Sequence, residues 1–147
     1  MYVVHKKLLA AVLGAVMLLS LAGCFREAVT PPKKAVTLAS AAQRVAYLQE
    51  QGWEIKETPI ETLTMVLPED LSEDWSDYCH LQSQQGLPFD QYGARQITRY
   101  TYAVTNYPDM EHGVQADLYL CDDILIGGDI IATGEDGFQQ GLQFPEE

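Results

Sequence analysis

The stretch Leu21-Ala22-Gly23-Cys24 constrains the fold most, because it separates a leader from the part of the chain that can form a domain. Two lysines precede an uncharged apolar run, Leu8–Leu21, whose 14 residues are fewer than the roughly 20 that a membrane-spanning helix needs. A basic start, a short apolar run and small residues before a cysteine are typical of a bacterial lipoprotein signal peptide. We expect cleavage between Gly23 and Cys24 to remove residues 1–23, which leaves 124 of the 147 residues.

Cys24 is then the first residue of the mature chain and the predicted site of lipidation. At about 0.8 kcal/mol per buried methylene, the two acyl chains of a diacylglyceryl group contribute on the order of 20 kcal/mol to membrane attachment. The prediction is a protein on the extracytoplasmic face of the cell membrane, anchored through lipid on Cys24. The alternative is an uncleaved signal anchor in which the cysteine is incidental.

The mature chain is strongly acidic. The leader holds two of the nine basic residues and none of the 21 acidic ones, so the mature net charge is −14. Such a surface repels phosphate backbones, and this excludes nucleic acid as a partner. The remaining cysteines, Cys79 and Cys121, could pair outside the cytoplasm. Strand parity argues against a disulfide, because Cys121 falls out of phase with the apolar positions of its strand.

The mature chain has the length of one domain with a short extension at each end. Residues 24–38 contain Pro31-Pro32 and Lys33-Lys34 without periodicity, which predicts an extended tether. Residues 39–140 are expected to form a single domain. The chain is rich in glycine and acidic residues from Thr133, which predicts a weakly ordered end with an acidic tail at 141–147.

Two segments have the pattern of helices. Ser40 and Gln43 form a capping box at the start of the first, which Gly52 ends. In the second, Asp70–Gln85, apolar side chains recur at helical spacing, and Asp70 with Glu73 repeats the capping pattern.

Alternating apolar residues predict strands in the segments between and after the helices. These segments are Trp53–Lys56, Thr62–Leu67, Arg95–Thr105, Val114–Leu120 and Ile124–Ala132. Strands that are apolar on one face need helices to cover that face. The predicted fold class is therefore α+β: an antiparallel sheet of about four to five strands with both helices packed on one face.

Several short stretches resemble a small family of bacterial lipoproteins, domain of unknown function 4830, over roughly residues 40–140. The stretches are Arg44-Val45-Ala46-Tyr47-Leu48, Gly52-Trp53-Glu54-Ile55, Arg99-Tyr100-Thr101-Tyr102, Asn106-Tyr107-Pro108 and Ile126-Gly127-Gly128-Asp129-Ile130. The resemblance implies a secreted, lipid-anchored domain in a Gram-positive-type envelope. It implies no activity, so it assigns no catalytic residue.

Two features are candidates for a ligand groove. Gly127-Gly128-Asp129 interrupts the last strand, where glycines admit a close approach to the backbone or form a bulge. Tyr100, Tyr102 and Tyr119 could line a groove for peptide or glycan. Aromatic residues at strand spacing more often belong to the core, so both features also have a purely structural interpretation.

Other chemistry finds little support in the sequence. Asp109, Glu111 and His112 share a loop, but no loop has the alternating oxygen ligands of a calcium site, so no metal and no cofactor are expected. Cys79 and His80 are adjacent on a predicted helix and point about 100° apart, which prevents direct pairing. Since motifs for nucleophilic, phosphate or zinc chemistry are also missing, the chain is not expected to be an enzyme.

These observations favour a binding or interaction module that meets an envelope protein, peptide or glycan. One alternative is a small envelope hydrolase with an unrecognised site around His112 and the acidic turns. Another is a purely structural or inhibitory lipoprotein.

Overall fold

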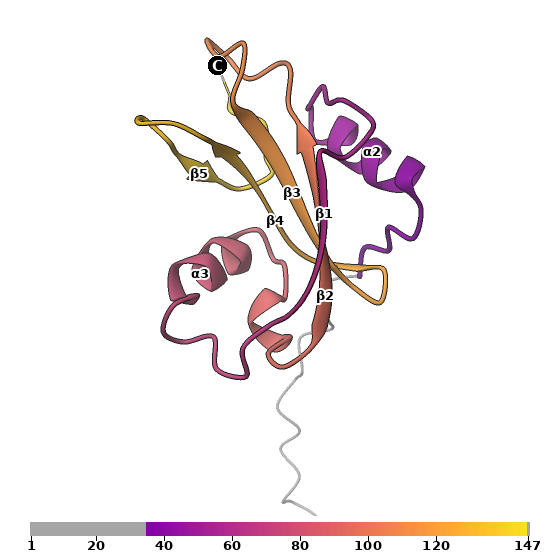
Figure 1. Cartoon of the computed structure of the whole chain (residues 1–147), viewed down its shortest axis with the longest axis vertical. Helices are drawn as coiled ribbons and strands as arrows, with labels where there is room; N and C mark the ends of the chain where they lie inside the picture. The colour runs from indigo at the N-terminus through magenta and orange to yellow at the C-terminus, as the bar shows by residue number, and fades with distance from the viewer. Residues whose placement is uncertain (1–34, 147) are drawn as a thin grey trace, which may run out of the picture. The chain divides into compact units, whose positions relative to one another are not determined.

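The computed structural model describes residues 35–146, which form two helices, a 3-10 turn and five strands (Figure 1). The elements in chain order are α2 (Ala41–Glu50), β1 (Glu61–Val66), α3 (Ser76–Gln84), η1 (Phe89–Gln91), β2 (Gln96–Ala103), β3 (Val114–Cys121), β4 (Ile124–Ala132) and β5 (Gln139–Gln140). All strand pairs are antiparallel, and the order across the sheet is β1-β2-β3-β4-β5. The α+β class and a sheet of five strands are thus confirmed. The predicted signal peptide and Cys24 lie outside the described residues.

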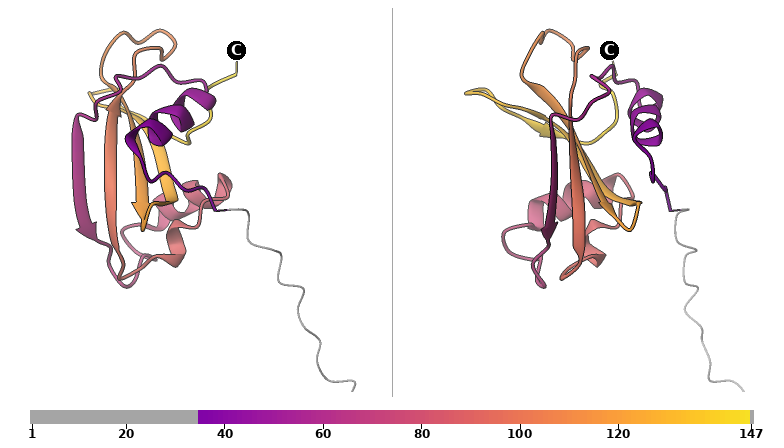
Figure 2. Two further views of the ribbon diagram at one scale, coloured as in Figure 1. Left: turned by 90° about the vertical axis from the view of Figure 1, so that its right-hand side faces the viewer. Right: turned by 45° about the vertical axis from the view of Figure 1, so that its right-hand side comes forward.

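The two helices cover opposite faces of the sheet, so the prediction that both pack on one face is wrong (Figures 1 and 2). On one face, which we call the α2 face, Val45 and Leu48 of α2 share a core with Tyr102 and with the even-numbered residues of β3. On the other, the α3 face, Tyr119 and Cys121 share a core with Phe89 and with side chains next to and within α3. The central strands are therefore buried on both faces.

The error has a physical cause in the odd-numbered positions of β3 and β4. Asp117, Tyr119 and Cys121 look like the solvent side of a half-buried strand, yet each is buried. Gly127 provides the room that α3 and η1 need, because a Cβ atom there would lie 2.8 Å from Cδ2 of Phe89. A pattern of alternation shows which residues share a face, but it does not show that the second face is also covered.

The helix starts follow local capping. The Ser40–Gln43 capping box is confirmed at the start of α2. The second helix begins at Ser76 instead of Asp70, because a carboxylate oxygen of Asp70 accepts from the backbone N–H of Ser72 at 2.8 Å and from its hydroxyl at 2.6 Å. Asp70 thus closes a local turn of its own, and this competes with the helical cap.

The C-terminal segment is part of the domain core, which corrects the prediction of a weakly ordered end. Leu142 is 2% exposed, and its carbonyl oxygen accepts from the Trp53 indole at 2.7 Å. Phe144 packs against the same indole with ring centroids 4.7 Å apart. This packing holds Trp53 in place. The segment 53–56, which the sequence predicts to be a strand, makes a single isolated β-bridge, between Ile55 and Val104. None of the helices among residues 35–146 is long and apolar enough to span a membrane.

Candidate functional site

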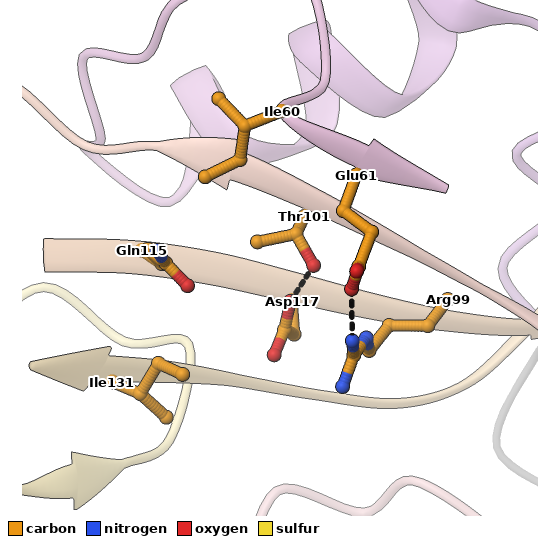
Figure 3. A pocket seen from close by; sticks show the side chains of 7 residues that line it. All are labelled: Ile60, Glu61, Arg99, Thr101, Gln115, Asp117 and Ile131. Atoms are coloured by element: carbon orange, nitrogen blue, oxygen red, sulfur yellow. Dashed lines mark hydrogen bonds and ion pairs between the residues drawn. The ribbon is translucent and has the colours of Figure 1, made fainter. Parts of the chain in front are cut away.

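A hollow of about 370 Å³ lies on the part of the α3 face that α3 leaves open (Figure 3). Strand register builds it, because Glu61, Thr101, Asp117 and Asp129 lie directly opposite one another across β1, β2, β3 and β4. The first three line the hollow together with residues from the neighbouring rows, which are Ile60, Arg99, Gln115 and Ile131. Four strands thus bring two carboxylates, a guanidinium, a hydroxyl and an amide to one place.

Asp117 lies at the centre of the hollow and is only 3% exposed. The Thr101 hydroxyl donates to its Oδ1 atom, and no group among residues 35–146 donates to Oδ2. Figure 3 shows this second oxygen directed away from Thr101. Burial raises the pKa of the Asp117 carboxyl, against the hydrogen bond from Thr101 and the charge of Arg99, which lower it. The carboxylate is therefore incompletely compensated by its own protein.

Asp129 faces Asp117 from β4 but is already satisfied. It is 1% exposed, and it accepts from the Tyr78 hydroxyl at 3.0 Å and from the Gln139 amide at 2.7 Å. Burial raises its pKa to about 6; the Gln139 hydrogen bond opposes this, and the charge of Asp117 adds to it. Asp129 does not line the hollow, so it contributes there only through its negative charge, next to Asp117 on the neighbouring strand β4.

Arg99 and Glu61 form an ion pair at the rim next to β1. Their side chains are 26% and 53% exposed, so the pair is open to solvent on the Glu61 side. The Nε atom of Arg99 is buried and has no partner among the described residues. Because the two charges offset each other, Asp117 carries the charge that the lining leaves unpaired.

The predicted aromatic groove does not form. Tyr100 and Tyr102 lie on the α2 face, where the Arg44 guanidinium lies 3.8 Å from the Tyr100 ring centroid and donates to the Tyr102 hydroxyl at 3.2 Å. Tyr119 lies on the α3 face and packs against Tyr78. Burial raises the pKa of Tyr119 to about 12, with smaller contributions from the two aspartates, so it remains a neutral phenol.

The predicted glycine site has a packing role instead. A Cβ atom on Gly127 would meet Phe89 on the α3 face, and one on Gly128 would lie 2.6 Å from Leu142 on the other face. The Gly128 N–H donates to the Gln82 side chain at 2.9 Å. The predicted bulge is present, since the register of β3 and β4 shifts beside this pair. None of the three residues lines the hollow, although Asp129 lies opposite Asp117, which does.

The other predicted candidates are not brought together. His112 is exposed on the loop before β3 and does not line the hollow. Cys79 and Cys121 belong to the same core on the α3 face, and both thiols are free. Residues 35–146 contain no group of three or more histidines, cysteines or carboxylates that could hold a metal ion. Gly23 and Cys24 lie outside the described part of the chain.

No sequence pattern predicts that Asp117, Arg99, Thr101 and Glu61 lie together. Asp117 did carry a signal, because an aspartate in the middle of a strand that is otherwise buried and apolar is unusual. Its neighbours could not be found in the same way, since they are assembled by strand register.

A family model described as Domain of unknown function (DUF4830) matches residues 47–130. The match begins within α2, ends at Ile130 within β4, and includes every residue that lines the hollow except Ile131. No curated protein and no solved structure gives a significant match.

Proposed function

Since the chain belongs to the family of Domain of unknown function (DUF4830), whose name assigns no activity, we propose a function from its leader and its hollow. The protein is a lipid-anchored, extracytoplasmic binding module. The hollow on the α3 face receives a polar group of an envelope protein, peptide or glycan. The leader sequence and Cys24 support the location, and the hollow supports the binding role.

The single observation that carries the binding role is the second carboxylate oxygen of Asp117. A buried carboxylate is costly unless hydrogen bonds or an opposite charge compensate it. Asp117 is 3% exposed and receives one hydroxyl donor, while an open volume lies beside it. A ligand with a donor group placed in the hollow supplies what the protein lacks.

Binding is favoured over the hydrolase alternative by the chemistry of the lining. No imidazole or thiol lines the hollow, and His112 is exposed elsewhere. The carboxyl with the pKa of about 6, Asp129, has both oxygens occupied by Tyr78 and Gln139. A general base must reach its proton directly or through one water, and Asp129 is not placed to do so.

The binding role can be tested by a thermal-shift screen of the full chain with short peptides, muropeptides and glycans. A ligand at 100 times its dissociation constant stabilises the folded state by about 2.7 kcal/mol, which raises Tm by several degrees. Ile131→Trp fills the hollow and should abolish the shift. Val66→Trp places the same indole at an exposed position of β1 outside the hollow and should preserve the shift. A shift that survives Ile131→Trp contradicts the proposal. A flat screen, together with no envelope protein cross-linked to the chain on intact cells, contradicts it as well and favours the structural or inhibitory alternative.

The location can be tested separately. Cys24→Ala removes the only sulfur in the predicted cleavage motif, so incorporation of radiolabelled fatty acid should be abolished. Full labelling of the Cys24→Ala protein contradicts the anchor.

A further inference from the structure

We propose that the hollow binds a primary alkylammonium group, with Asp117 as its counter-ion. This inference rests on the proposed binding role and names the chemistry of the ligand.

The sign of the charge follows from the lining. Arg99 is the one cation among the residues that line the hollow, and its charge is offset by Glu61 in an ion pair. Asp117 forms no ion pair with a described residue, and its hydrogen-bond donor is the neutral hydroxyl of Thr101. Asp129 adds a second carboxyl at the register position behind Asp117. Both carboxylates attract a cation that enters the hollow, and both repel an anion.

The hydrogen-bonding groups fit an ammonium better than a guanidinium. An ammonium carries three donors on one atom, and Asp117 Oδ2 together with the Gln115 amide oxygen can accept from it. The Gln115 side chain makes no hydrogen bond to a described residue, so it is free to turn its oxygen inward. A guanidinium binds a carboxylate best with two parallel bonds, and Thr101 already occupies one oxygen of Asp117.

The same geometry favours an organic cation over a metal ion. Calcium needs six or more oxygen ligands, and the hollow offers two carboxylates, of which Glu61 is bound to Arg99. Ile60 and Ile131 stand on opposite sides of the hollow (Figure 3). Ile60 is 54% exposed, so it offers an apolar contact to an alkyl chain that leads out to solvent.

Two sources share this chemistry: the side chain of a lysine in a partner protein or peptide, and a free alkylamine. The test uses the full chain in an uncharged detergent and measures binding by isothermal titration calorimetry. The probes are n-pentylammonium, n-pentanol and pentanoate, which have the same alkyl chain and differ in the charge of the head group. Nα-acetyl-lysine-N-methylamide is the probe for a lysine side chain.

We expect n-pentylammonium to bind while pentanol and pentanoate do not. Asp117→Asn keeps the size and the Thr101 contact, and it should weaken binding about 10-fold or more. Asp90→Asn removes the same charge at an exposed position of η1 and should leave the affinity unchanged. Ile131→Trp should prevent binding without a change of charge, and circular dichroism checks that each variant is folded.

Tighter binding of the lysine derivative than of n-pentylammonium assigns the site to a lysine of a partner, and the reverse order assigns it to a free alkylamine. Equal binding of pentanol, preferred binding of pentanoate, or an unchanged affinity of Asp117→Asn overturns the inference. Failure of both amines overturns it as well. If the ligand screen still gives a shift that Ile131→Trp abolishes, the binding role stands without the ammonium. If neither the screen nor cross-linking on intact cells gives a partner, the ammonium inference and the binding role are both refuted.

Discussion

Replacement of Asp129 by asparagine tests the electrostatics beneath the hollow. Burial raises the pKa of this carboxyl to about 6, from 3.8 in the exposed state. Between these two pH values the folded state binds more protons than the unfolded state, so the free energy of unfolding falls as the pH rises. A shift of about two pH units corresponds to about 3 kcal/mol, present below pH 4 and lost above pH 6.

The asparagine is expected to fit the site. Its oxygen can accept from Tyr78, and its amide can donate to Gln139 once that exposed side chain turns its own amide over. Because asparagine does not titrate, Asp129→Asn should remove this part of the pH dependence. The variant should gain stability relative to the wild type as the pH rises.

The assay is urea denaturation of a soluble form, residues 24–147 with Cys24→Ser, at pH 5.0 and pH 7.5. Both values lie above the isoelectric point of about 4.4, where an acidic chain stays soluble. The two-pKa relation gives a relative gain of about 1 to 2 kcal/mol for Asp129→Asn between these pH values. Asp90→Asn controls for the general loss of one negative charge. Parallel pH profiles for the wild type and Asp129→Asn would refute the reasoning.

Two further substitutions test the two cores. Trp53→Phe removes the hydrogen bond to the Leu142 carbonyl, which should lower the free energy of unfolding by about 1 to 2 kcal/mol and speed amide exchange in residues 139–146. Unchanged exchange there would contradict the role of Trp53 in holding the C-terminal segment. Gly127→Ala places a methyl group 2.8 Å from Phe89, which should weaken the packing of α3 and lower the free energy of unfolding, measured with urea, by about 1 to 3 kcal/mol. An unchanged free energy of unfolding would mean that this contact is not tight.

Much of the fold was predictable because its signals are local. The Ser40–Gln43 capping box and the alternation in β1, β2, β3 and β4 depend on residues that are close in sequence. The alternation of odd and even positions along β3 also placed Cys121 correctly on the face opposite the even-numbered core residues of that strand. It did not show that α3 covers this second face.

The site was less predictable because it depends on register. Asp117 meets Thr101 and Asp129 only after three strands are aligned. The loop between β2 and β3 contains turn residues, Pro108, Asp109 and Gly113, but it is longer than a tight hairpin turn, so these residues do not fix the alignment. The tyrosines were identifiable as an aromatic set, but their division between the two faces was decided by the same pairing. Lipidation of Cys24 stays a prediction from the leader.

The most direct measurement is the pKa of Asp117 itself, followed by ¹³C NMR of its carboxyl carbon with and without n-pentylammonium. If the ammonium binds the ionised carboxylate about 10-fold more tightly than the neutral acid, linkage lowers the pKa by about one unit at saturation. We expect this decrease at Asp117, with Glu61 little affected. An unchanged pKa of Asp117 under saturating n-pentylammonium would contradict the assignment of this carboxylate as the ligand-binding group.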